Sequence, residues 1–192
     1  MALTDHCDDQ VLRQQLVNVA RRMNSTGLNQ GTSGNLSARI KGGILVTPSS
    51  LPYEQMEADD LVALDLSGHP LREQQRRPSS EWRLHADVLN GRSEAMAVVH
   101  CHPIHATALA CHDRGIPAFH YMVAVAGGDE IRCAPYATFG TKELSENVVE
   151  ALGPRNACLL ARHGMVTLGK DLESALRVAV EVETLARMYL QA

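Results

Sequence analysis

Residues 98–112 have the sequence VVHCHPIHATALACH, which predicts a buried strand followed directly by a helix. The strand is the apolar run AMAVVHC at 95–101, and Pro103 suits the first turn of the helix after it. Side chains two positions apart on a strand share a face, so His100 and His102 are expected to point the same way. Two imidazoles on one face can bind one metal ion.

A third histidine stands at another predicted strand end. His163 lies where the apolar stretch ACLLA at 157–161 meets Gly164, and functional sites collect at strand ends in α/β proteins. Three imidazoles with an open fourth position are typical of a catalytic zinc site. From spacing alone, local hydrogen bonding of each histidine is about as well supported as a metal site. Local hydrogen bonds are also the expectation for His6, His69, His85, His105 and His112.

Glu81 is the candidate acidic partner of these histidines. A helix is expected to start near Ser79 and Ser80, because serine favours the N-cap, and to continue through WRLHADVL at 82–89. The simpler interpretation of Glu81 is that an acidic residue at the start of a helix interacts favourably with the helix dipole. The alternative is a general base or an additional metal ligand.

The remaining pattern mixes strands and helices. It predicts helices at 9–24, 141–152 and 171–190, a strand pair joined by a hairpin at 41–43, and strands at 61–66, 131–134, 157–162 and 165–169. Several hairpin-like strand pairs favour an α/β/α layered fold over a doubly wound sheet. No repeat or linker interrupts the pattern, so residues 1–192 are expected to form one domain.

Composition favours a small-molecule partner. The net charge is −4 and the basic residues are scattered, so no surface for nucleic acid or an anionic membrane is expected. No apolar run approaches the roughly 18 residues of a membrane span. The first residues lack the pattern of a signal peptide, so a cytoplasmic protein is expected. Five cysteines without a CxxC pair predict reduced thiols.

Three short stretches rich in glycine and hydroxyl residues predict anion binding. They are GTSGNLS at 31–37, TPSS at 47–50 and PSSE at 78–81. Backbone N–H groups and hydroxyls gathered in such loops bind phosphate, and a helix N-terminus adds to the attraction. Each loop alone is weak evidence, because turns use the same residues. Together with a metal site, they favour a phosphorylated substrate.

Seven sequence blocks, in order, resemble the class II aldolase/adducin family, and within it the L-fuculose 1-phosphate aldolases. The resemblance extends from about Val11 to Leu190. The blocks are GLNQGTSGNLS (27–37), TPSSLPYE (47–54), PSSEW (78–82), VVHCH (98–102), FHYMVAVAGG (119–128), CAPYATFGTKELS (133–145) and RHG (162–164).

The resemblance implies a fold, an assembly and a set of site residues. The fold is an α/β/α sandwich around a mainly antiparallel sheet, and the assembly is a homotetramer with active sites at subunit interfaces. One zinc ion per subunit is held by His100, His102 and His163, with Glu81 beside it as ligand or acid/base. Tyr121 reaches in from a neighbouring subunit. Phosphate binding is implied for Gly34, Asn35, Ser49, Ser50, Ser79 and Ser80, with Asn29 and Thr32 nearby and Phe139 on the aldehyde side.

The implied reaction is cleavage of the C3–C4 bond of a ketose 1-phosphate into dihydroxyacetone phosphate and an aldehyde, through an enediolate that zinc stabilises. Glu81 would exchange a proton with the enediolate carbon, and Tyr121 with the oxygen that becomes the aldehyde. The three lysines, Lys41, Lys142 and Lys170, offer few candidates for an imine mechanism, because none lies in an obviously apolar segment.

Two departures from the fuculose pattern concern the substrate pocket. Ser50 stands where the family often has glycine. The sequence stops at Ala192, just after the closing helix, whereas the fuculose enzymes continue into a tail whose tyrosine covers the aldehyde end. We therefore expect a pocket that suits 5-deoxyribulose 1-phosphate or its methylthio analogue as well as fuculose 1-phosphate.

Three alternatives remain open at this point. A pentulose 5-phosphate 4-epimerase would be expected to have aspartate at position 81 and to lack HYMVAVAGG. A methylthioribulose 1-phosphate dehydratase is the other enzymatic alternative to the aldolase. An adducin-like scaffold domain would be expected to lose metal ligands, whereas this chain keeps three histidines and Glu81.

Overall fold

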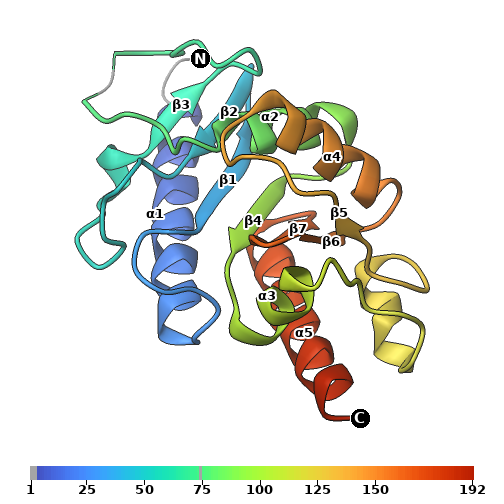
Figure 1. Ribbon diagram of the computed structural model, residues 1–192. Helices are drawn as coiled ribbons and strands as arrows, with labels where there is room; N and C mark the ends of the chain where they lie inside the picture. Colours follow the sequence, from blue (N-terminus) through green and yellow to red (C-terminus); the bar gives the residue numbers. More distant parts are fainter. Residues whose placement is uncertain (1–3, 74) are drawn as a thin grey trace.

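A seven-stranded sheet organises the chain in the computed structural model, which describes residues 4–73 and 75–192 (Figure 1). The strand order is β3-β2-β1-β4-β7-β6-β5. Every neighbouring pair is antiparallel except β5 with β6. The expected mainly antiparallel sheet is therefore confirmed. The strands are β1 Asn35–Ile40, β2 Gly43–Val46, β3 Val62–Leu64, β4 Ala97–Cys101, β5 Cys133–Ala134, β6 Ala157–Leu160 and β7 Gly164–Gly169.

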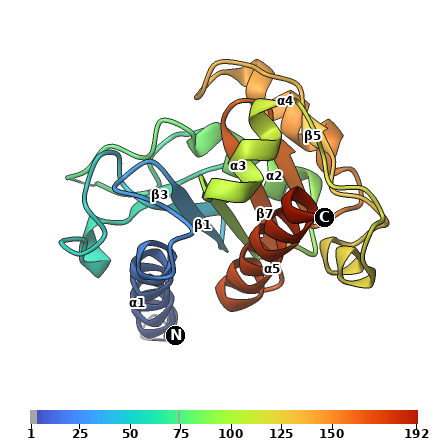
Figure 2. The same ribbon diagram turned by 60° about the horizontal axis from the view of Figure 1, so that its bottom comes forward.

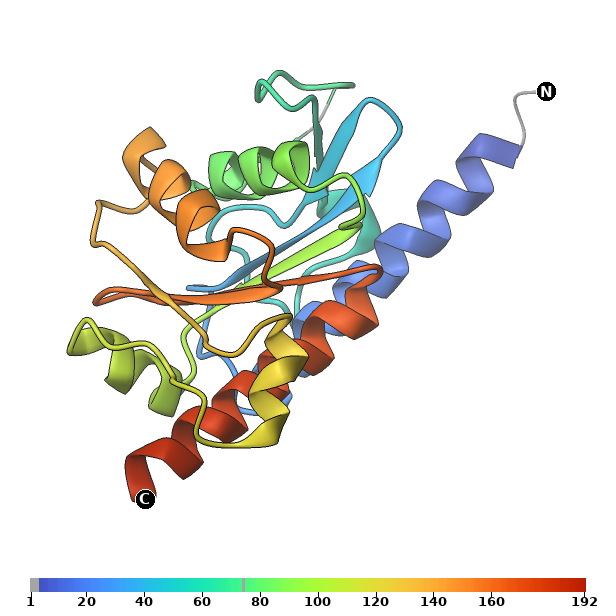
Figure 3. The same ribbon diagram turned by 90° about the vertical axis from the view of Figure 1, so that its right-hand side faces the viewer.

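Helices cover both faces of this sheet, as the layered pattern predicted. Seen edge-on, α2 and α4 lie over one face, and α1, α3 and α5 lie under the other (Figures 2 and 3). The helices are α1 Thr4–Ser25, α2 Trp82–Gly91, α3 Ile104–Cys111, α4 Lys142–Leu152 and α5 Leu172–Gln191, with 3₁₀ helices η1 Ala58–Asp60 and η2 Tyr121–Ala126. None of these helices combines the length and the apolar character needed to cross a membrane.

The alternation of side chains along β4 separates two hydrophobic cores. Ala97, Val99 and Cys101 belong to the core shared with α1, α3 and α5, whereas Val98 belongs to the core under α2 and α4. His100 has the same parity as Val98 and therefore faces α2. His102 continues the alternation past the strand end, since a residue before proline favours extended backbone.

Strand register brings a distant hairpin to the end of β4. Cys101 pairs with Met165 across β4 and β7, and Leu160 pairs with Gly164 across β6 and β7. The three-residue turn between β6 and β7 contains Arg162 in a left-handed conformation, with φ 57°. His163 ends this turn and so lies beside His102.

Gly164 makes this close approach possible. A Cβ atom at position 164 would lie 2.5 Å from the Cys101 carbonyl oxygen and 2.6 Å from Cδ2 of His102. Both separations are shorter than any ordinary contact, so a larger residue would displace β4 or the His102 ring.

The predicted start of α2 was wrong by two or three residues. The helix begins at Trp82 with Glu81 as N-cap, so Ser79 and Ser80 lie before it. The physical reason is that the Ser79 N–H donates to the Thr47 carbonyl at 3.0 Å, which holds residues 78–80 extended beside a neighbouring loop. The Ser79 hydroxyl accepts from the Glu81 N–H at 3.3 Å.

We expect Gly164→Ala to lower the free energy of unfolding by roughly 1–3 kcal/mol, the usual cost of overpacking. Gly91→Ala is the matched control, because a Cβ added at position 91 meets nothing within 4 Å. It lies at the end of α2 and should be neutral or stabilising by up to about 1 kcal/mol. Urea unfolding of both variants measures the difference, and equal stabilities would contradict the close approach.

Candidate metal centre and substrate cavity

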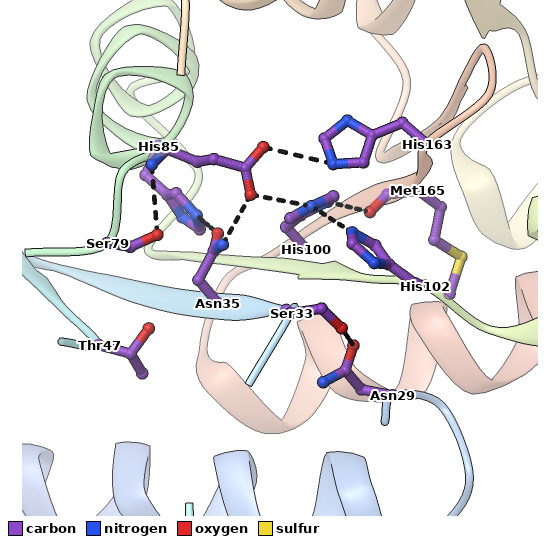
Figure 4. A network of polar contacts seen from close by, with 12 residues as sticks. Asn29, Ser33, Asn35, Thr47, Ser79, His85, His100, His102, His163 and Met165 are labelled. Carbon is purple, nitrogen blue, oxygen red and sulfur yellow. Dashed lines mark hydrogen bonds and ion pairs between the residues drawn. The ribbon is translucent and has the colours of Figure 1, made fainter. Parts of the chain in front are cut away.

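His100, His102 and His163 converge at the end of β4. Their ring centroids lie 4.7–4.9 Å apart, and one nitrogen from each lies within 4.8 Å of the others. Figure 4 shows the three imidazoles turned toward one another. His100 is fully buried, while the other two are partly accessible. The predicted convergence of residues distant along the chain is therefore present in the fold.

The hydrogen bonds of His100 leave its Nε2 atom available to a metal. Its Nδ1 donates to the Met165 carbonyl oxygen at 2.9 Å, so the proton of the neutral ring is on Nδ1. His102 Nε2 lies 3.0 Å from His100 Nε2. Burial, with the neighbouring histidines, lowers the pKa of His102 to about 3. Burial lowers the pKa of His163 to about 4, so both rings present lone pairs at neutral pH.

Glu81 adds a buried carboxylate to the histidines. Its Oε2 lies 3.2 Å from His100 Nε2, and its Oε1 lies 3.5 Å from His163 Nε2. Burial alone would raise the pKa of Glu81, but the attraction of His100 and His163 and a hydrogen bond from Asn35 bring that pKa below its usual range. In turn, Glu81 raises the pKa of His100 despite burial of the ring. Glu81 therefore favours positive charge on His100, whereas burial keeps His102 and His163 neutral.

These donors fit a divalent cation. Within the described part of the chain, Glu81 Oε1 is buried without a hydrogen-bond partner. An uncompensated buried carboxylate oxygen is costly, and a cation beside three imidazole nitrogens would compensate it. Neutral imidazole nitrogens with one nearby carboxylate form a donor set that suits zinc and related transition metals.

A cavity of about 320 Å³ opens beside this centre. It is lined by Thr32, Ser33, Gly34, Asn35, Pro48, Ser49, Ser50, Ser79, Ser80, Glu81, His102, Phe139 and His163. Most of the predicted substrate residues are therefore together in one place. None of these lining residues is lysine or arginine, so an anion would be held by hydroxyl and backbone N–H groups.

Two of the cavity loops are held side by side by backbone hydrogen bonds. The Ser49 N–H donates to the Arg77 carbonyl and the Ser79 N–H donates to the Thr47 carbonyl, both at 3.0 Å. This pairing places the hydroxyls of Ser49, Ser50, Ser79 and Ser80 around one cavity. The predicted gathering of the loops is thus a consequence of strand-like pairing.

Ser50 adopts a backbone conformation that suits glycine better. Its φ is 59°, in the left-handed region, where a residue with Cβ is strained by about 1–2 kcal/mol. This agrees with the expectation that glycine is common at this position in the resembled family. In this chain the strained residue adds a hydroxyl to the cavity.

Three predicted site residues lie outside the cavity lining. His100 is buried behind it, and Asn29 accepts a hydrogen bond from Ser33 at 3.4 Å and so braces the loop (Figure 4). A Cβ at position 34 would lie 2.7 Å from the His100 carbonyl oxygen and 2.8 Å from Asn29 Oδ1, which explains the glycine there. Tyr121 belongs to η2, is 81% exposed and does not line the cavity.

The sequence reasoning missed three buried residues that support the site. His85 and Ser37 hydrogen-bond to each other next to Asn35, and the Tyr53 hydroxyl donates to the Gly34 carbonyl. A signal existed for the first two, because His85 follows Glu81 by four residues and Ser37 follows Asn35 by two. No sequence signal marked Tyr53.

Comparison with known proteins identifies the family. The model of the "Class II Aldolase and Adducin N-terminal domain" family matches residues 14–190. The chain belongs to the class II aldolase/adducin family. It is 51% identical over 178 residues to a 5-methylthioribulose-1-phosphate/5-deoxyribulose-1-phosphate aldolase of Rhodospirillum rubrum, covering 93% of this chain and 80% of the relative.

Other class II aldolases are similarly close. An L-fuculose phosphate aldolase of Escherichia coli is 49% identical over 179 residues, covering 93% of this chain and 82% of the relative. A solved L-fuculose 1-phosphate aldolase aligns with a TM-score of 0.90 and 38% identity, over 94% of this chain and 85% of that one. With its three-histidine centre, the chain is a metal-dependent class II aldolase.

We expect zinc to stabilise metal-free protein through these histidines. A metal that binds only the folded state adds about 2.7 kcal/mol when its free concentration is a hundred times Kd. His163→Ala should abolish the rise in Tm, because it removes one of three ligands. His112→Ala is the control, because His112 is exposed and outside the centre. An undiminished rise in the His163 variant would place the metal elsewhere.

Proposed function

We propose that this class II aldolase cleaves the C3–C4 bond of a ketose 1-phosphate whose far end is a deoxy or methylthio group, releasing dihydroxyacetone phosphate and an aldehyde. The observation that carries the proposal is a single cavity that joins a three-histidine centre with Glu81 to loops rich in hydroxyl groups. The relatives named for L-fuculose phosphate and for 5-deoxyribulose 1-phosphate aldolases support it.

We propose zinc as the metal, one ion per subunit, held by His100, His102 and His163 with Glu81 beside it. Bound there, zinc would supply Lewis-acid stabilisation of the negative charge that develops on the sugar oxygens. The neutral state of His102 and His163 at neutral pH supports this role, since metal binding requires unprotonated nitrogens. The mainly nitrogen donor set argues against magnesium or calcium.

The phosphate group is proposed to bind at the other side of the cavity. Gly34 and Asn35 would meet it from β1, and Ser49, Ser50, Ser79 and Ser80 from the paired loops, with Thr32 nearby. Asn29 would act by holding the loop through Ser33. Hydroxyl and backbone donors bind a phosphate without a basic side chain when several converge.

Proton transfer is proposed for Glu81 and Tyr121. Glu81 lines the cavity, and its Oε1 has no hydrogen-bond partner in the described structure, which supports proton exchange between this carboxylate and the substrate carbon. Tyr121 would act at the oxygen that becomes the aldehyde, from a neighbouring subunit of a homotetramer. Its 81% exposure and the 64% exposure of Phe139 at the cavity support an interface there.

A panel of ketose phosphates tests the substrate. We expect the zinc-loaded enzyme to release dihydroxyacetone phosphate from L-fuculose 1-phosphate, 5-deoxyribulose 1-phosphate and its methylthio analogue, and chelation to abolish release. Pentulose 5-phosphates are the control, because they carry the phosphate at the wrong end. Epimerisation of a pentulose 5-phosphate without cleavage of any 1-phosphate would overturn the proposal.

Glu81→Gln tests the proposed proton transfer. Loss of a general base typically costs about 10²–10⁴-fold in rate, so we expect kcat to fall by that order while zinc content and KM change little. Thr107→Val is the control for a substitution that leaves the cavity unchanged, since Thr107 belongs to α3 and does not line the cavity. Near-native turnover of a zinc-loaded Glu81 variant would exclude this role.

A further inference from the structure

A buried chain of hydrogen bonds connects Glu81 to a histidine that does not touch the metal centre. The Asn35 amide Nδ2 donates to Glu81 Oε2 at 2.9 Å. The opposite end of the same amide, Oδ1, lies 2.5 Å from His85 Nε2. The Ser37 hydroxyl lies 2.8 Å from His85 Nδ1. Each of the four residues is at most 4% exposed.

The spacing of a strand matches the spacing of a helix at this place. Asn35 and Ser37 are two residues apart on one face of β1, a separation of about 6.7 Å. Glu81 and His85 are four residues apart at the start of α2, a separation of about 6 Å. The two pairs therefore face each other, with Asn35 hydrogen-bonded to both Glu81 and His85. Figure 4 shows His85 beside Asn35.

The chemistry of the groups determines the direction of every hydrogen bond. A carboxylate only accepts, so Asn35 must present its NH₂ group to Glu81 and its carbonyl oxygen to His85. His85 Nε2 must then carry a proton. Burial lowers the pKa of His85 to about 3, so the ring is neutral and its Nδ1 accepts from Ser37. One tautomer satisfies all four groups.

We propose that His85 is a positioning residue that fixes the orientation of the Glu81 carboxylate through Asn35. Without the Nε2–H donor, the Asn35 amide would be free to rotate and to present its oxygen to the carboxylate, which is repulsive. With it, Oε2 accepts from Asn35 and Oε1 is left facing His163, at the side of the cavity that Glu81 and His163 line. The kinetic consequence of this assignment rests on the proposed role of Glu81.

The kinetic test compares three variants of the zinc-loaded enzyme. His85→Leu introduces an apolar side chain of similar size and removes the donor to Asn35. We expect kcat to fall about 10–100-fold, as is usual for the outer partners of a metal site. KM and zinc content should be retained. His85→Gln offers an amide donor to Asn35 and should recover most of the loss. If His85 only filled space, the glutamine variant would not be expected to recover kcat.

Ser145→Ala is the matched control for loosening of α2. The buried Ser145 hydroxyl donates to Asp87 on α2 at 2.7 Å, away from Asn35. This variant should lower the stability and leave kcat unchanged. The positioning role is overturned if His85→Leu keeps native kcat, if His85→Gln is as slow as His85→Leu, or if Ser145→Ala is equally slow.

The tautomer of His85 gives a readout that does not depend on turnover or on any variant. A long-range ¹H–¹⁵N spectrum of the zinc-loaded wild-type enzyme should show a neutral ring protonated at Nε2. A ring protonated at Nδ1, or at both nitrogens, would contradict the hydrogen-bond chain. If Glu81→Gln remains active while His85 has the expected tautomer, the proposed function of Glu81 fails and the structural assignment stands.

Discussion

The buried negative charge of Glu81 is the constraint on which the centre depends. A carboxylate out of water needs compensation from every side. His100 and His163 face it directly and Asn35 donates to it, while Oε1 remains without a hydrogen bond in the described structure. Compensation of Oε1 therefore depends on the His163 ring, 3.5 Å away, and on a cation bound beside it.

The rest of the fold supplies the compensating groups from three separate elements. β1 contributes Asn35, β4 contributes His100, and the β6–β7 turn contributes His163, while Glu81 itself is the N-cap of α2. Antiparallel pairing of β1 with β4 and of β4 with β7 brings Asn35, His100 and the β6–β7 turn to one end of the sheet, although they are distant along the chain. The close approach requires glycine at two places, since a Cβ at Gly34 or Gly164 would meet backbone within 2.7 Å.

The cavity has a rigid side and an exposed side. Buried residues and backbone hydrogen bonds hold the metal centre and the paired serine loops. Phe139 is largely exposed among the cavity residues, and Tyr121 does not line the cavity. The proposed steps common to ketose 1-phosphate cleavage would take place in the rigid part. The part that would contact the aldehyde half is the least enclosed, which agrees with relatives that are named for different sugars at nearly equal identity.

The sequence by itself determined the layered fold class, the strand parity that places His100 and His102 on one face, and the hydroxyl-rich loops, because these follow from local periodicity and turn chemistry. Residue spacing along the sequence left the role of Glu81 open. It also misplaced the start of α2, because the hydrogen bond of Ser79 to a neighbouring loop competes with helix capping. Only the tertiary structure showed that His85 hydrogen-bonds to Asn35, which in turn donates to Glu81. Such a chain depends on the distance between a strand and a helix, and long-range packing rather than local sequence sets that distance.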